Sequence, residues 1–292
     1  MDKNKIINVM TVDLKEWFVV EIFSDRLGPE SWDRLPTRVE DNTYHLIELL
    51  ESRGVHATFF ILGWVADRFP KLIQDISEAG HEIGCHSYWH RRVDQITPDQ
   101  FRSDTQRAID AIESACGTRP YGYRAPGWSI NSRNMWALDI LAELGFTYDS
   151  SIFPVKHDVY GDPAAPRTLV ELATAGNETI FEFPASTVRL MGRNVPIAGG
   201  GYLRHSPYWY SSRMIRRLNR EGLPAMVYVR PWEFDVGQPK VDGIGLRDHF
   251  RQYASIGSFK RKFERLLDDF EFSTALSHIE KSQRRPIGFE RT

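Results

Sequence analysis

The sequence predicts an α/β protein built on a parallel β-sheet, either open or closed into a barrel. Through the first two-thirds of the 292 residues, apolar runs of strand length alternate with longer segments whose apolar residues recur at helical spacing. Such alternation is typical of βα units, in which each helix returns the chain to start another parallel strand. Hydrophobic residue types make up 41% of the chain, and no internal repeat or low-complexity linker interrupts it, which favours a single domain.

The expected helices of the first half each end at a glycine, the residue type that most often follows a helix C-terminus. Thr97 and Gln100 have the spacing of a capping box, and Pro98 suits a first helical turn. Pro70 is expected to kink the helix that contains it. Strands are expected at 6–12, 55–62, 81–86 and from 146, and helices at 41–53, 65–79, 97–116 and 131–144.

The pattern changes after Asp149. Three prolines within residues 154–167 indicate a loop, and the segments 168–173 and 179–183 are expected to pair as a hairpin. The glycine triplet 199–201 is interpreted as a tight turn, since a phosphate-binding loop would call for a following lysine and helix. The remaining expected elements are a helix at 206–221, a strand at 225–229, an amphipathic helix at 259–270 and a polar, basic tail at 281–292.

Charge and composition narrow the classes of function. The formal net charge of −2 gives no strong attraction to nucleic acid or to an anionic membrane. No apolar stretch approaches the ~18 residues of a membrane span, and residues 6–12 are too few for the apolar core of a signal peptide. With two cysteines, no disulfide framework is indicated. We therefore expect a cytoplasmic protein that binds no nucleic acid and does not span a membrane; action at the inner membrane face and the oligomeric state are left open.

Polar residues follow several of the expected strands. His86 and His90 come after the third strand, at a spacing that lets two imidazoles bind one metal ion, although such a pair also arises by chance. Asp13 ends the first strand, Arg124 follows Gly122-Tyr123, and Arg230 follows the strand at 225–229. Because parallel strands end at one edge of a sheet, these side chains are expected to converge. This convergence favours an enzyme.

Several motifs of the chain, taken in order, resemble those of polysaccharide deacetylases, carbohydrate esterase family four. They are Thr11-Val12-Asp13, Ala57-Thr58-Phe59-Phe60, the His86 and His90 pair with its lead-in from Gly80, and Arg124 with Pro126-Gly127. Later motifs around Gly199-Gly200-Gly201, Pro231-Trp232-Glu233 and Leu246-Arg247-Asp248 are similar to a bacterial subgroup associated with exopolysaccharide loci.

The resemblance implies a distorted (β/α) barrel, often of seven strands, with a small α+β extension at its C-terminal end. We expect one domain over residues 1–280, with its core at about 6–235 and the extension at about 236–280.

The resemblance also implies a reaction and a cofactor. A divalent metal ion would polarise the acetamide carbonyl of an N-acetylated amino sugar and activate water. Zinc is the expected ion and cobalt or nickel are alternatives; a further alternative is that no metal ion is bound. The implied metal ligands are Asp13, His86 and His90. Asp13 would also be the base, with Arg124 holding it in place; the alternative for Arg124 is a surface salt bridge. The implied function is deacetylation of a polysaccharide or oligosaccharide.

Two aromatic residues are candidates for contact with the sugar. By the same resemblance Trp89 and Trp128 would supply apolar walls for the substrate, while simple core packing is the alternative for both.

Two positions depart from the pattern of the family. Lys15 stands where an acidic residue is expected, and a protonated lysine is no metal ligand, although Glu16 could reach in if the strand bends. Arg230 stands where the subgroup has a histidine that protonates the leaving amine; an arginine could instead stabilise an oxyanion or bind an acidic sugar. His205 is a candidate replacement donor, or a structural histidine. These departures support an alternative function, a catalytically silent member that binds a saccharide or a partner protein.

Overall fold

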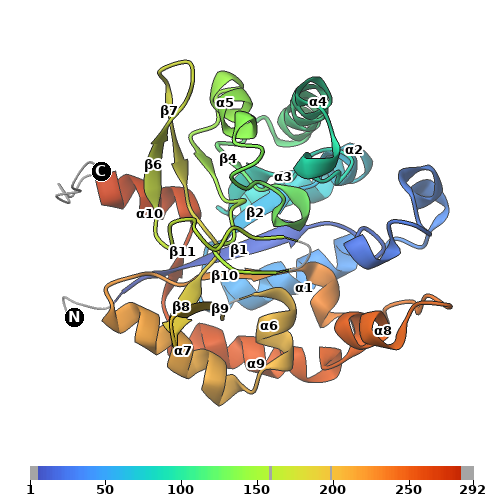
Figure 1. Ribbon diagram of the computed structural model, residues 1–292. Helices are drawn as coiled ribbons and strands as arrows, with labels where there is room; N and C mark the ends of the chain where they lie inside the picture. Colours follow the sequence, from blue (N-terminus) through green and yellow to red (C-terminus); the bar gives the residue numbers. More distant parts are fainter. Residues whose placement is uncertain (1–5, 158–159, 198, 284–292) are drawn as a thin grey trace.

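The computed structural model describes residues 6–157, 160–197 and 199–283 (Figure 1). Within these ranges one curled sheet has the strand order β10-β1-β2-β3-β4-β5-β7-β6, and β11 pairs with the start of β1. A separate hairpin joins β8 and β9. The strands are β1 (Asn8–Leu14), β2 (Thr58–Ile61), β3 (Glu82–Cys85), β4 (Gly122–Tyr123), β5 (Tyr148–Asp149), β6 (Val170–Ala173), β7 (Thr179–Glu182), β8 (Thr187–Leu190), β9 (Arg193–Pro196), β10 (Met226–Val229) and β11 (Phe272–Ser273).

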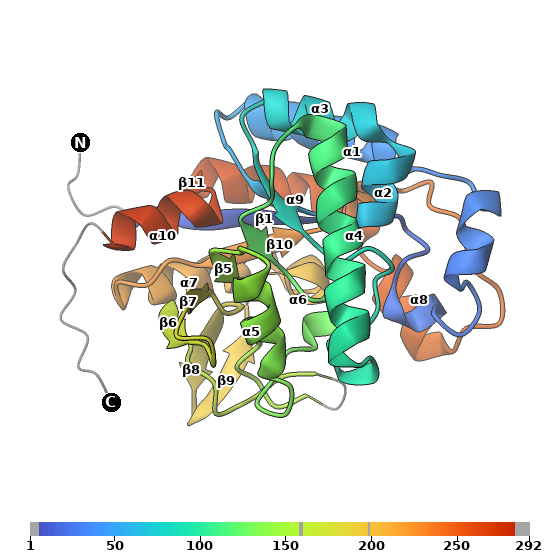
Figure 2. The ribbon, with the colours of Figure 1, turned by 90° about the horizontal axis from the view of Figure 1, so that it is seen from above.

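Helices surround this sheet, as Figures 1 and 2 show from two directions. The α-helices are α1 (Val39–Glu51), α2 (Gly63–Arg68), α3 (Pro70–Glu78), α4 (Pro98–Cys116), α5 (Trp136–Glu143), α6 (Gly200–His205), α7 (Tyr208–Arg220), α8 (Leu246–Tyr253), α9 (Ile256–Asp269) and α10 (Ala275–Gln283). The 3-10 helices are η1 (Glu21–Phe23), η2 (Pro29–Arg34), η3 (Val93–Gln95), η4 (Pro126–Trp128) and η5 (Pro231–Phe234). In the described part of the chain, no helix has the length and apolar character needed to cross a membrane.

The predicted α/β class is confirmed. Seven strands of the described path, from β10 through β1 to β5 and then β7, are successive parallel neighbours, and β6 adds an antiparallel edge. Every residue of β1 is buried, as expected for a central parallel strand that is covered on both faces. The sheet curls into half a barrel, and its strands bring their C-terminal ends to the same side, where the candidate site lies.

Several sequence predictions are confirmed locally. Thr97 and Gln100 form the expected capping box at the start of α4. Segments 170–173 and 179–182 pair as the expected antiparallel hairpin. Pro70 does more than kink a helix: it separates α2 from α3, with the intervening Phe69 at φ −131° and ψ 57°.

Other predictions need correction. The helix expected from residue 131 begins at Trp136, because Asn134 accepts a hydrogen bond from the Asn131 N–H and donates to the Ser129 carbonyl, holding a non-helical turn. The glycine triplet is no simple turn, since α6 begins at Gly200. At Gly199 a Cβ atom would lie 2.0 Å from the Tyr228 ring, so close packing on β10 calls for glycine there. The predicted polar tail at 281–292 begins inside α10, and residues 284–292 lie outside the described ranges.

Candidate active site

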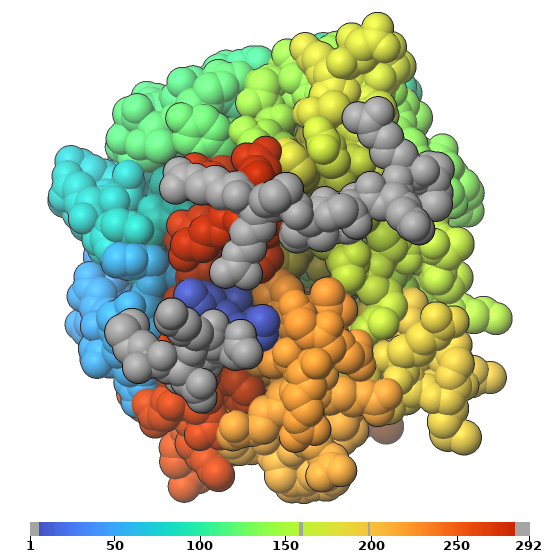
Figure 3. Space-filling model, turned by 90° about the vertical axis from the view of Figure 1, so that its left-hand side faces the viewer, coloured from blue at the N-terminus to red at the C-terminus, as the bar shows by residue number. Residues whose placement is uncertain are grey.

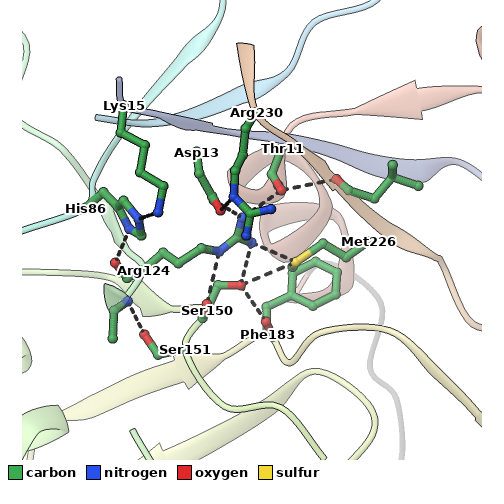
Figure 4. A network of polar contacts seen from close by, with 12 residues as sticks. Thr11, Asp13, Lys15, His86, Arg124, Ser150, Ser151, Phe183, Met226 and Arg230 are labelled. Carbon is green, nitrogen blue, oxygen red and sulfur yellow. Dashed lines mark hydrogen bonds and ion pairs between the residues drawn. The ribbon is translucent and has the colours of Figure 1, made fainter. Parts of the chain in front are cut away.

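The end of β1 supplies the carboxylate of the site. Asp13 is 2% exposed, and its Oδ1 accepts a hydrogen bond from Arg124 Nη1 at 3.0 Å (Figure 4). Its other oxygen, Oδ2, lies 3.6 Å from Arg230 Nε. Burial by itself raises the pKa of Asp13, but the charges of Arg124 and Arg230 outweigh it and hold this pKa well below its usual range. Asp13 is therefore ionised at neutral pH.

Arg124 is the centre of the buried polar network. It follows β4, is 1% exposed, and its backbone N–H donates to the Cys85 carbonyl of the neighbouring strand. Its guanidinium donates to Thr11 Oγ1 at 2.8 Å, to the Ser150 carbonyl at 3.1 Å and to Ser150 Oγ at 2.9 Å, besides Asp13. The expected pairing of Arg124 with Asp13 is thus present, and the surface salt bridge does not apply.

The two histidines lie on a folded turn after β3 and not on a helix. Ser87 and His90 have positive φ values of 64° and 55°, a conformation that side chains other than glycine adopt at a cost. The Asp104 carboxylate on α4 supports the turn, because it accepts hydrogen bonds from the backbone N–H groups of Tyr88 and Trp89. This turn places the His86 and His90 ring centroids 5.1 Å apart.

Lys15 lies against both histidine rings. Its Nζ is 3.5 Å from His86 Nε2 (Figure 4) and 2.5 Å from His90 Nε2. The side chain of Lys15 is buried. Burial and the charge of Arg230 lower the pKa of Lys15 to about 7. Burial and the charge of Lys15 also lower the pKa of His86 to about 3, so its imidazole is neutral.

Arg230 brings a second guanidinium to Asp13 from the end of β10. Its backbone N–H donates to Glu233 Oε2 at 3.0 Å, which fixes the start of η5. Glu233 is fully buried and also lies 3.4 Å from Arg204 Nε on α6. The site is therefore rich in positive charge: Lys15, Arg124 and Arg230 surround one ionised aspartate.

The metal ion that the resemblance implies does not fit these residues. Glu16 turns away from the histidines, because its carboxylate accepts hydrogen bonds from the Arg38 and Val39 N–H groups at the start of α1. Asp13 is bound by arginines, and Lys15 Nζ lies between the histidine nitrogens. Among the described residues, no group of three His, Cys, Asp or Glu side chains is arranged to bind a metal ion.

The other candidate residues are more dispersed. Trp128 is buried beside the network, with Arg124 Cζ 4.8 Å from its ring centroid. Trp89 packs on Trp32, with ring centroids 6.0 Å apart. His205 lies on α6, where its ring stacks on Phe250, and none of the polar contacts described for it involves Asp13 or the two site histidines.

Sequence reasoning missed three polar partners. Thr11 precedes Asp13 by two residues, so the two side chains lie on the same face of β1. This spacing could have predicted that Thr11 contacts the same partner, Arg124. Ser150 follows the short strand β5 and could have been found as another strand-end polar residue. Asp104 lies in mid-helix, where no sequence signal set it apart.

Two family descriptions and a solved structure are similar to this chain. Residues 30–148 match the family description "Polysaccharide deacetylase", and residues 150–280 match "Domain of unknown function (DUF3473)". A putative polysaccharide deacetylase of Mycobacterium smegmatis has a similar fold, with a TM-score of 0.60 and 21% identity over 98% of this chain and 95% of that one.

Two curated relatives match a little under half of the chain. A peptidoglycan-N-acetylglucosamine deacetylase of Bacillus cereus is 30% identical over 146 residues, 46% of this chain and 52% of the relative. A peptidoglycan deacetylase-like protein of Gibberella zeae is 31% identical over 137 residues, 45% and 39% of the two chains. The chain thus spans about half or less of the length of these relatives. At the level of the family, the activity is deacetylation of carbohydrates. Residues 30–148 are thus similar to the polysaccharide deacetylase family, and residues 150–280, which follow them, match the domain of unknown function.

Proposed function

We propose that this chain hydrolyses the acetamide group of N-acetylated amino sugars in an oligosaccharide or polysaccharide. The observation that carries the proposal is the buried, ionised carboxylate of Asp13 at the end of β1, in contact with two guanidinium groups. The match of residues 30–148 to the polysaccharide deacetylase family supports the same reaction, and the name of the Bacillus cereus relative supports N-acetylglucosamine as the sugar.

Amide hydrolysis needs a group that deprotonates water, positive charge near the carbonyl oxygen, and a proton for the departing amine. Asp13 would orient the attacking water and accept its proton, which passes to the amine nitrogen as the C–N bond breaks. Arg230 places positive charge beside this carboxylate, where it would stabilise the oxyanion that forms from the carbonyl. The products are acetate and a free amino sugar.

The test is acetate release from N-acetylglucosamine oligomers. Asp13→Asn should lower kcat/KM by roughly 10²-fold or more, the usual contribution of a general base. Asp25→Asn makes the same chemical change at an exposed position and should leave the rate unchanged. Activity of Asp13→Asn equal to that of the parent would refute the assigned role.

A second candidate function is saccharide binding without hydrolysis. The observation that favours it is the position of Lys15 Nζ against both histidines, because the site then has a fixed ammonium group where the expected reaction has a metal ion. Calorimetric titration with the same oligomers would detect binding. A parent that binds them without releasing acetate, together with release by a Lys15→Glu/Arg230→His variant, would establish the second function and exclude the first.

A further inference from the structure

The contacts of Lys15 carry an inference of their own. The residue directly follows β1, whose pairing with β10 and β2 fixes where its backbone begins. Its side chain is 4% exposed and extends to the histidine turn, where Nζ lies 2.5 Å from His90 Nε2 and 3.5 Å from His86 Nε2. The Lys15 nitrogen carries N–H donors, and both histidine Nε2 atoms lie within reach of them.

His86 is oriented as a metal-binding histidine usually is. His86 Nδ1 is 2.7 Å from the Arg124 carbonyl oxygen, and a carbonyl can only accept, so Nδ1 carries the proton. The lone pair of His86 is therefore on Nε2, the atom that faces Lys15. A backbone carbonyl that fixes the tautomer in this way is the common second partner of a metal-binding histidine.

We propose that the side-chain nitrogen of Lys15 takes the place of a divalent metal ion between His86 and His90, so that this chain binds no such ion at the histidine pair. A zinc ion would need to lie about 2.0–2.1 Å from each ring nitrogen. That position overlaps Lys15 Nζ, which is already 2.5 Å from His90 Nε2.

The buried Lys15 side chain and the ion pairs of Asp13 both disfavour a metal ion at this position. A protonated Lys15 repels a dication, and a neutral Lys15 still fills the space between the two rings; moving it aside would require its buried side chain to leave the site. The third expected ligand, Asp13, has Arg124 and Arg230 against its two oxygens. Hydrolysis at this site, where the proposed function holds, then proceeds without a metal ion and is unaffected by chelators.

The test measures metal binding and is independent of activity. The parent, Lys15→Glu, Lys15→Met and Lys15→Glu/His90→Ala are incubated with Zn²⁺ and dialysed, and bound zinc is measured by mass spectrometry and by the shift in Tm. We expect no specific zinc in the parent and about one equivalent in Lys15→Glu, because glutamate completes a two-histidine, one-carboxylate set. His90→Ala in that background should remove it.

The controls separate the alternatives. Lys240→Glu makes the same charge change at an exposed position and should gain no zinc. About one equivalent of zinc in the parent, lost in a His90→Ala variant, would overturn the proposal. Failure of both Lys15→Glu and Lys15→Met to bind zinc, with circular dichroism matching that of the parent, would overturn it equally, since another feature would then exclude the ion. Loss of deacetylation alone would bear on the proposed function and not on this inference.

Discussion

Replacing Arg124 by methionine tests the physical basis of the site. The Arg124 and Asp13 side chains are 1% and 3% exposed, so the substitution leaves a charged carboxylate in the protein interior with a weaker partner 3.6 Å away, Arg230. Removing one partner of a buried ion pair costs about 3–5 kcal/mol of the free energy of unfolding. Serine and threonine groups that lose their guanidinium partner add to this cost.

The assay is denaturant unfolding of the parent and the variant, followed by circular dichroism and by tryptophan fluorescence. Arg102→Met is the matched control, because it removes a guanidinium from an ion pair with Glu143 whose side chains are 42% and 53% exposed. Exposed pairs contribute about 0–1 kcal/mol, so this control should unfold nearly as the parent does.

A double-mutant cycle isolates the pair. Asp13→Asn removes the charge that Arg124 compensates, so the two substitutions together should cost less than the sum of each alone, by about 1.5 kcal/mol or more. If Arg124→Met costs no more than Arg102→Met, or if the two changes are additive, the ion pair does not hold Asp13 as argued.

Three further predictions concern residues around the site. Burial raises the pKa of both Asp149 and Glu182, and that of Asp149 reaches about 6. The contribution of this pair to the free energy of unfolding is therefore greatest below the unfolded-state pKa values near 4, and it is lost as the pH rises through 6. Glu182→Gln should therefore gain Tm relative to the parent between pH 5 and pH 8, and parallel curves would contradict this. Asp104→Ala leaves two backbone N–H groups of the histidine turn without their acceptor, and should lower the unfolding free energy by about 1–3 kcal/mol, whereas Asp104→Asn should lose less. Glu16→Ala removes the acceptor of two N–H groups at the start of α1 and should lower the unfolding free energy in denaturant by about 1 kcal/mol. If Lys15→Glu binds zinc and Lys15→Glu/Glu16→Ala does not, Glu16 faces the histidines and this assignment is wrong.

The positions of Asp13, Arg124 and Arg230 at one edge of the sheet followed from the sequence. Each comes just after an apolar run of strand length, and the topology of parallel strands then decides where the side chains meet. This inference needs only strand order and direction, which local patterns carry well.

The direction of individual side chains did not follow in the same way. Glu16 was a candidate to reach into the site, but the start of α1 lies next to it and offers two N–H donors. The position of α1 next to Glu16 results from tertiary packing, and the local sequence pattern does not predict it. Lys15 was recognised as a departure from the family, yet its contact with both histidines depends on the positive φ of His90.

Residues 150–280, the part of the chain that matches the domain of unknown function, were the hardest to predict. Strands β8, β9 and β11 have two to four residues each, too few for a reliable alternation of apolar and polar residues. Helix α8 buries only Gln252, so its exposed face carries Leu246 and Phe250 and gives no clear apolar stripe toward a core.

The pairing of β1 with strands from the far end of the chain affects the order of folding. On the face shown in Figure 3, the blue surface at the start of β1 lies beside the red and orange surface of the C-terminal segments. Val9 pairs with Met226 and Asn8 with Phe272, so β1 is synthesised before these neighbours, which follow more than two hundred residues later. During synthesis one edge of this apolar strand remains open, and an open edge is a site of wrong pairing. The strand that carries Asp13 and precedes Lys15 is thus completed last, which makes assembly of the active site one of the final events of folding.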